Sequence, residues 1–287
     1  MASKTIRVLS LFSGCGGMDL GLEGGFSIHK GCINEKSNPD FIEKQERGDL
    51  VKLYSTRFQL VFANDILKEA RTAWVHYFAK YGYTPDVYRE ESIVDLVKRH
   101  RAGELVFPEK VDVVTGGFPC QDFSVAGKRN GFNSHKDHKG KIIDGEIASE
   151  ETRGKLYMWM KEVIEITKPK LFIAENVKGL VNLSNVKEII QQDFSRADGD
   201  GYIVLEPRVL HAADYGVPQS RERVIFIGIR KSALTPAARE ALMRDVIPDE
   251  YVPYPSPSHA YHIKNKGLMP PQTVGGMFAG LKEPEDS

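Results

Sequence analysis

The sequence predicts an α/β fold, a mostly parallel twisted β-sheet with helices on both faces. Two observations lead to it. Short apolar, β-branched runs alternate with segments of helical 3–4 spacing between residues 6 and about 230. Several of these runs also stop at Gly-Gly or at an Asn or Asp, as buried strands do where they leave a sheet. The 287 residues suffice for one large domain, alone or with a small appendage.

Each element follows from its own stretch of sequence. Strands are expected at 6–12, 60–63, 111–115, 171–174, 203–210 and 224–229, and helices at 18–22, 68–80, 155–167 and 186–194. Residues 31–59 form a polar, charged insertion between the first helix and the second strand. From residue 247 prolines interrupt any periodicity. We therefore expect a main domain over 1–246 and a Pro-rich tail over 247–287.

Composition limits the classes of partner. Lys plus Arg and Asp plus Glu number 39 each, so a polyanion must bind a local basic surface rather than the overall charge. Three unpaired cysteines suit a reducing compartment, and the lack of CxxC or HExxH spacing gives little support for a metal. No signal-like start or run of 18 apolar residues occurs, so a cytoplasmic location without a membrane is expected.

Cys120 is the candidate nucleophile. It follows the apolar run 111–115, Gly116-Gly117 and Pro119, at the point where a strand becomes a loop. At such an edge of an α/β sheet a thiolate can be exposed enough to attack a substrate. Taken alone, however, a small apolar Cys that caps a strand is the favoured interpretation.

Other strand ends carry residues that could act with Cys120. Glu175 would emerge at the same edge and could hold or deliver a proton. Asp65 could accept hydrogen bonds from ribose hydroxyls or cap the next helix. The Gly-rich turn 12–17 allows close approach of a ligand, although its spacing is not GxGxxG. The row 219–223 could bind an anion or a carbonyl oxygen, or form a salt-bridge cluster with Glu222.

Together these motifs resemble the cytosine-5 DNA methyltransferase family. The matching segments are Phe12-Ser13-Gly14-Cys15-Gly16-Gly17, Asn64-Asp65-Ile66, Gly117-Phe118-Pro119-Cys120-Gln121-Asp122-Phe123-Ser124, Ala126-Gly127-Lys128-Arg129-Asn130-Gly131, Arg153-Gly154-Lys155-Leu156, Glu175-Asn176-Val177 and Asp214-Tyr215-Gly216-Val217-Pro218-Gln219-Ser220-Arg221-Glu222-Arg223. Their order and spacing agree with the family from residue 6 to about 230.

The resemblance implies a Rossmann-like fold that uses S-adenosylmethionine to methylate carbon 5 of a cytosine flipped out of duplex DNA, as part of a bacterial restriction-modification system. It implies catalytic roles for Cys120, Glu175, Arg221 and Arg223. Cofactor contacts are implied for Phe12, Ser13, Gly14, Cys15, Gly16, Gly17, Asp65, Ile66, Ser92, Ile93, Phe118, Pro119 and Leu156. DNA contacts are implied for Gln121, Ser124, Lys128, Arg129 and Gln219, and residues 121–154 resemble the loop that closes over DNA.

The sequence departs from the family in three places. Where the third strand commonly ends in an acid that binds the adenine amine, the best match is Ser92-Ile93, with Glu91 or Asp95 as substitutes. The 31–59 insertion has no counterpart that we can place. The target-recognition region and the motifs after it are missing, with 247–287 at its threshold. We therefore expect the catalytic part of a split enzyme, completed by a second polypeptide.

Two alternatives remain. A tRNA cytosine-5 methyltransferase would share the catalytic core, although Asp122-Phe123-Ser124 resembles the DNA-specific type. A non-catalytic regulatory paralogue would bind DNA or a partner without turnover, although Cys120, Glu175 and Arg223 are all present.

Overall fold

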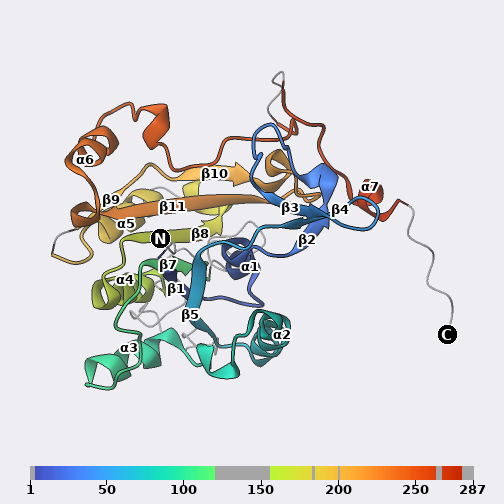
Figure 1. The fold of residues 1–287 in the computed structure, drawn as a ribbon. Helices are drawn as coiled ribbons and strands as arrows, with labels where there is room; N and C mark the ends of the chain where they lie inside the picture. The colour runs from blue at the N-terminus through green and yellow to red at the C-terminus, as the bar shows by residue number, and fades with distance from the viewer. Residues whose placement is uncertain (1–3, 120–155, 183–184, 200, 263–266, 280–287) are drawn as a thin grey trace. The chain divides into compact units, whose positions relative to one another are not determined.

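The computed structural model describes residues 4–119, 156–182, 185–199, 201–262 and 267–279 (Figure 1). Its strands are β1 (Ile6–Leu11), β2 (Ser27–His29), β3 (Ile42–Gln45), β4 (Leu50–Leu53), β5 (Phe58–Asp65), β6 (Tyr88–Glu90), β7 (Val113–Gly116), β8 (Leu171–Val177), β9 (Tyr202–Val204), β10 (Arg208–His211) and β11 (Glu222–Arg230). Its α-helices are α1 (Gly17–Glu23), α2 (Lys68–Phe78), α3 (Ile93–Arg101), α4 (Leu156–Thr167), α5 (Val186–Ser195), α6 (Pro236–Leu242) and α7 (Val274–Phe278).

The predicted fold class is confirmed. An eight-stranded sheet runs in the order β10-β11-β8-β7-β1-β5-β6, and β9 pairs with β11 in antiparallel orientation. The pairs β1–β5, β1–β7, β5–β6 and β7–β8 are all parallel. Such a sheet needs cover on both faces, because its central strands have no solvent-facing side.

Two apolar clusters provide this cover. Leu9, Val114 and Phe172 of the sheet belong to one cluster with buried residues of α3, α4 and α5. Val8 and Val113, which neighbour two of these residues in sequence, belong to the other cluster with α2, and α1 packs against it. Because successive strand residues point to opposite faces, the two clusters mark the two faces of the sheet.

Most expected elements are present with boundaries shifted by a few residues. The strand expected at 203–210 is wrong in one respect, because the structure divides it into β9 and β10 around 205–207. Pro207 has no N–H to donate to a strand ladder, which accounts for a break there. The strands and helices not predicted from the sequence are β2, β3, β4, β6, α3, α6 and α7.

The chain divides into two compact units. The first, which we call the sheet unit, comprises 1–23, 57–208 and 224–253. The second, the small unit, comprises 24–56, 209–223 and 254–287. Most of the insertion therefore groups with most of the Pro-rich tail, a connection that sequence analysis did not make. The boundary expected at 246/247 stays a prediction of where the catalytic domain ends.

The small unit has its own sheet, in the order β2-β4-β3 with antiparallel pairing. Asn34, buried in the unit, donates its side-chain amide to the carbonyl oxygens of Ser258 (3.0 Å) and Gly267 (3.3 Å). His259 Nε2 lies 2.9 Å from the carbonyl oxygen of Gly31. These bonds join the insertion to residues more than 220 positions later in the chain. No helix in the described parts of the chain is long and apolar enough to cross a bilayer.

A buried carboxyl group lies in the second cluster of the sheet unit. Asp19 is fully buried and its Oδ2 accepts a hydrogen bond of 2.8 Å from Trp74 Nε1. Burial raises the pKa of Asp19 to about 6, because its charged form loses hydration. Trp74 in turn stacks on Phe78 with ring centroids 4.5 Å apart. Asp19 thus orients the aromatic ring that fixes α2 on the sheet.

We predict that Asp19→Asn flattens the pH dependence of stability. A raised pKa means that the folded state binds the proton more tightly than the unfolded state, so Asp19 favours folding below about pH 4. That contribution is lost as the pH rises from about 4 to about 6. Asn keeps an acceptor for Trp74 but does not titrate. From about pH 4 to about pH 6 the free energy of unfolding of wild type should fall by about 3 kcal/mol relative to that of the variant, as urea unfolding measures. Parallel curves would contradict the assignment.

Candidate functional site

The carboxyl ends of the parallel strands meet at one edge of the sheet unit. Leu11 is in register with Asn64 of β5 and with Gly116 of β7. Gly116 is in register with Ala174 of β8, and Asp65 with Glu90 of β6. The residues that follow these positions therefore emerge side by side. This is the edge at which open α/β sheets bind their ligands.

Two residues, Ser13 and Asn64, lock β1 to β5 at this edge. The Ser13 N–H donates to the carbonyl oxygen of Asn64 (2.8 Å), and the Asn64 N–H donates back to Ser13 Oγ (3.1 Å). The buried Asn64 amide also donates to the carbonyl oxygens of Arg89 (3.0 Å) and Glu91 (2.8 Å), at and just after the end of β6. One Asn thus fixes the spacing of three chain segments. Phe12, immediately before the lock, has a φ of +52°, a strained value for a bulky residue.

Asp65 is held in place by backbone N–H groups. Its Oδ1 accepts from Ile66 (2.7 Å) and Leu67 (3.1 Å), and its Oδ2 accepts from Gly14 (3.0 Å). The next helix, α2, has Leu67 at its N-cap without a side-chain cap, so Asp65 does not cap it directly. A carboxylate has about four acceptor positions, so three N–H donors leave Oδ2 able to accept one more hydrogen bond.

A pocket of about 200 Å³ opens beside Asp65. Its walls come from the ends of β1, β5, β7 and from the start of α3 and α4, namely Phe12, Asn64, Asp65, Ile66, Leu67, Ser92, Ile93, Gly117, Pro119 and Leu156. The structure thus brings together Phe12, Asp65, Ile66, Ser92, Ile93, Pro119 and Leu156, which sequence analysis proposed as cofactor contacts. It adds Asn64, Leu67 and Gly117. Ile66 and Leu67 are 37% and 55% exposed, so apolar surface faces the opening.

The remaining expected cofactor residues lie outside the walls of this pocket and stay predictions. Ser13 and Gly14 hold the lock and Asp65. Phe118 is buried, with its ring centroid 6.1 Å from that of Tyr157. Gly16 has a φ of +89°, and a Cβ there would lie 2.4 Å from the Phe78 ring. Gly16 therefore allows α1 to approach α2. Cys15 is exposed, and a Cβ on Gly17 would meet no atom within 4 Å.

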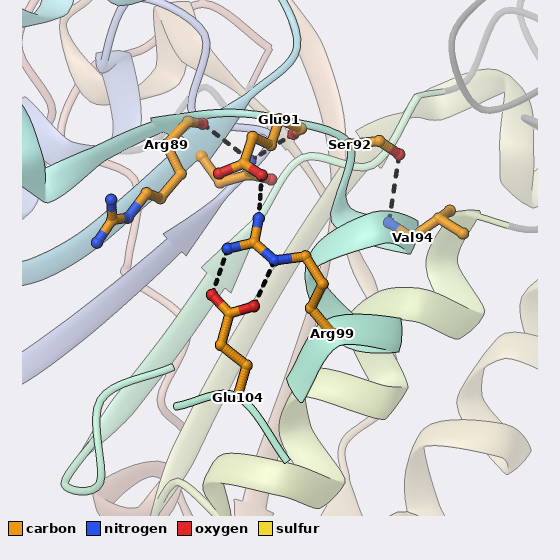
Figure 2. A network of polar contacts seen from close by, with 7 residues as sticks. Arg89, Glu91, Ser92, Val94, Arg99 and Glu104 are labelled. Atoms are coloured by element: carbon orange, nitrogen blue, oxygen red, sulfur yellow. Dashed lines mark hydrogen bonds and ion pairs between the residues drawn. The ribbon is translucent and has the colours of Figure 1, made fainter. Parts of the chain in front are cut away.

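The third-strand position is occupied by Ser92. Its hydroxyl caps α3 by accepting the Val94 N–H at 3.3 Å, and it faces the pocket together with Ile93. Figure 2 shows that Glu91 points instead toward Arg99, which binds Glu104 as well. The carboxylate of Glu91 is thus engaged in an ion pair and does not line the pocket. Of Ser92, the best match to the family's acid, and Glu91, one of its substitutes, Ser92 is the residue that lines the pocket.

Glu175 lies against the segment that leads to Cys120. Its Oε2 would be 3.1 Å from a Cβ placed on Gly117, so the carboxylate covers that glycine. The buried Asn176 donates its side-chain amide to the carbonyl oxygen of Phe118 at 3.2 Å, and its Oδ1 accepts from the Val177 N–H. The end of β8 thus holds residues 117–118 and places a carboxylate directly beside them. The expected proximity of Glu175 to this segment is observed.

The family can now be assigned, because a model of the C-5 cytosine-specific DNA methylases matches residues 6–266. The chain belongs to this family. It is 34% identical over 278 residues to the type II methyltransferase M.BsuRI of Bacillus subtilis, covering 96% of this chain and 51% of the relative. It is 32% identical over 213 residues to M.HpaII of Haemophilus parainfluenzae, covering 69% and 49%. The chain therefore spans about half the length of these relatives.

A solved structure of a putative DNA modification methyltransferase encoded within a prophage (E. coli) has the same fold. Its TM-score is 0.53 at 22% identity, and the match covers 99% of this chain and 57% of the other. At this identity the likeness concerns the fold alone. It agrees with the mostly parallel sheet and the flanking helices described above.

The other expected catalytic and DNA-contacting residues of this methylase belong to other parts of the chain. Gln219 and Arg221 are exposed and Arg223 is half-buried, all within the small unit. Of these three, Arg223 is in a strand, and its guanidinium donates to the carbonyl oxygen of Glu222 at 2.8 Å. The remaining predictions fall outside the described residues, on Cys120, Gln121, Ser124, Lys128 and Arg129.

We predict that Asn64→Ala lowers the free energy of unfolding by about 2–3 kcal/mol. The substitution removes a buried amide, so the carbonyl oxygens of Arg89 and Glu91 lose their donor. Chemical denaturation monitored by Trp fluorescence measures the loss. Asn38→Ala is the matched control, since the Asn38 amide makes one long bond of 3.4 Å at a half-buried position. It should cost less than about 0.5 kcal/mol. Equal losses of stability in both variants would contradict the proposed role of Asn64 in joining the strand ends.

Proposed function

We propose that this methylase transfers a methyl group from S-adenosylmethionine to carbon 5 of cytosine in duplex DNA. One observation carries the proposal: a partly apolar pocket with a fixed carboxylate, Asp65, opens at the strand edge where Glu175 covers Gly117, three residues before Cys120 in sequence. Family membership and the names of the bacterial relatives support it. A cytoplasmic role in restriction-modification belongs to the same proposal.

The pocket residues fit the cofactor in chemical type. Asp65 Oδ2 would accept a hydrogen bond from a ribose hydroxyl, since it accepts only the Gly14 N–H and has room for a second donor. Ile66 and Leu67 would cover the adenine ring with apolar surface. Ser92 offers a hydroxyl where the family commonly has an acid, so the adenine amine would be bound by a neutral acceptor. The turn 12–17 would face the methionine end.

The cofactor supplies an electrophilic methyl group on its sulfonium. Cys120 would attack carbon 6 of a flipped-out cytosine as a thiolate, which makes carbon 5 nucleophilic. Glu175 would hold a proton at ring nitrogen N3 and so disperse the negative charge that develops there. Arg223, with Arg221, would bind the base oxygen. Carbon 5 would take the methyl group as its bond to the sulfonium sulfur breaks and the thioether product leaves. A base would then take the proton from carbon 5, and the carbon 6–sulfur bond would break to restore the base double bond and the Cys120 thiolate.

DNA must be held by local positive and polar groups because the formal net charge is zero. We propose that Ser124, Lys128 and Arg129 contact phosphates, with Gln121 and Gln219 near the target base. Sequence recognition requires contacts with base edges in a groove. We propose that a second polypeptide supplies this recognition.

A reciprocal pair of variants tests the assignment of the two halves of the site. Cys120→Ser should bind S-adenosylmethionine normally and transfer methyl groups at least about 10³-fold more slowly. Asp65→Asn keeps the Oδ1 acceptor for Ile66 and Leu67 but loses the anionic Oδ2, so cofactor affinity should fall about 10-fold or more. Calorimetry and tritium transfer to DNA provide the two measurements.

Cys32→Ser serves as the control for the thiol substitution, because Cys32 is half-buried in the small unit and has no proposed role. It should retain wild-type binding and transfer. Turnover by Cys120→Ser within about 10-fold of the wild-type rate would refute its role as nucleophile. Unchanged cofactor affinity in Asp65→Asn would refute the placement of the ribose.

A second polypeptide can be tested by reconstitution. The chain alone should bind cofactor yet methylate no defined DNA sequence, and addition of the product of an adjacent reading frame should produce site-specific methylation. Bisulfite sequencing of a plasmid locates the modified cytosines, and a tRNA substrate provides the comparison for the RNA alternative. Full site-specific methylation by the chain alone would contradict the need for a second polypeptide, and preferential methylation of tRNA would contradict duplex DNA as the substrate.

A further inference from the structure

A buried histidine in the small unit lacks a partner for one ring nitrogen. His211, at the end of β10, is 6% exposed, and its Nδ1 makes no hydrogen bond within the part of the chain that the structure describes. Its other nitrogen, Nε2, lies 3.2 Å from Ser220 Oγ. The ring is further held by Tyr261, which stacks on it at 4.8 Å with an interplanar angle of 6°. A buried polar atom without a partner costs about 1–3 kcal/mol, so a ligand at this nitrogen would be stabilising.

Two further ligand groups converge on the same place. Asp214 and His262 each offer an atom that, with one from His211, lies within 4.8 Å of the others. The Asp214 carboxylate is buried, while 53% of the His262 side chain is exposed. His262 Nδ1 lies 3.5 Å from Asp214 Oδ2, and the His262 N–H donates to Asp214 Oδ1 at 2.8 Å. All three residues belong to the small unit.

The arrangement has the features of a metal centre rather than of a simple ion pair. An Asp–His pair accounts for Asp214 and His262, but it leaves His211 Nδ1 without a partner among the described residues. Metal-ligating histidines usually bond their second nitrogen to a neighbouring polar group that fixes the ring, as Ser220 does here. Tetrahedral ligand atoms about 2.1 Å from a metal lie about 3.4 Å apart. The three ligand atoms here lie within 4.8 Å of one another, so small side-chain adjustments would bring them to that spacing.

We propose that His211, Asp214 and His262 bind a divalent transition-metal ion of the zinc type, with His211 contributing Nδ1 and a water molecule completing the shell. Two imidazoles and one carboxylate suit zinc or cobalt, whereas magnesium and calcium prefer oxygen ligands throughout. The ion would link β10, the following 3-10 turn at Ala212–Tyr215 and residues 258–262. Sequence analysis found little support for a metal because these ligands follow neither CxxC nor HExxH spacing.

The ion would fix the segment that carries the expected base and DNA contacts. Asp214 accepts the N–H groups of Ser258 and His259 through its backbone carbonyl, both at 2.9 Å. Ser220, which orients His211, stands between Gln219 and Arg221. The Ala212 N–H also donates to the carbonyl oxygen of Arg221 at 2.8 Å. A metal at this cluster would therefore restrain residues 211–223 against 258–262 within the small unit.

Metal binding can be measured on tag-free protein stripped with EDTA. Zinc titration against a chromophoric chelator should give about one equivalent bound and raise the melting temperature by about 4 °C at saturation. Cobalt should give visible d–d absorption, whereas magnesium should leave the melting temperature unchanged. His262→Gln and Asp214→Asn should each weaken zinc binding at least ~10-fold, and Ser220→Ala should weaken it by about 10-fold.

His76→Gln is the matched control, since His76 is exposed on α2 in the sheet unit. It should bind zinc as wild type does. Asp214→Asn changes a buried carboxylate that also accepts the His262 N–H, so the exposed His262 provides the decisive variant, with folding checked by circular dichroism. Equal zinc affinity of wild type and folded His262→Gln, or no zinc and cobalt binding by wild type, would overturn the proposal. Both readouts are independent of methyl transfer.

Discussion

The site depends on the lock between Ser13 and Asn64. Parallel strands connect to each other only through long crossovers, so nothing in the chain path alone fixes how their ends meet. Here reciprocal bonds of 2.8 and 3.1 Å join β1 to β5, and the Asn64 amide extends the connection to the carbonyl oxygens of Arg89 and Glu91 at the end of β6. A buried amide whose nitrogen makes two hydrogen bonds tolerates little displacement, because each lost bond leaves a carbonyl without a donor. Phe12, Asn64 and Asp65, which line the pocket, are therefore held in place by the same hydrogen bonds.

Next to the lock, the carboxylate of Asp65 has a fixed orientation. Asp65 uses three of its acceptor positions on local N–H groups, so the carboxylate is oriented before any ligand arrives. Pre-orientation reduces the entropy lost on binding. At the next strand pair, Asn176 holds the carbonyl oxygen of Phe118 and Glu175 covers Gly117. The proposed cofactor and base sites thus rest on the same device, an amide that ties one strand end to its neighbour.

The sequence was sufficient for the sheet unit because its signals are local. Apolar runs such as 111–115 mark buried strands, and polar residues at their ends mark the edge, which is why Asp65 and Glu175 could be proposed. It was insufficient for the small unit. β3 has the sequence Ile-Glu-Lys-Gln, with three exposed residues. It is held by backbone hydrogen bonds to β4, and backbone pairing of this kind leaves no pattern of apolar residues in the sequence. Ser92 was found only through the resemblance, and its commitment to capping α3 required coordinates.

The metal cluster shows the same limit in a sharper form. His211 and Asp214 are close in sequence, but His262 comes 48 positions after Asp214 and reaches it through a backbone bond at its own N–H. Such a site depends on how the tail folds back within the small unit, so no spacing rule could reveal it. Among the described residues of the small unit, the buried apolar ones are Val51, Ala213 and Tyr254. Buried polar anchors such as Asn34, His259 and Asp214 then carry much of the order, and an ion at His211 would satisfy a ring nitrogen that the described residues leave without a partner.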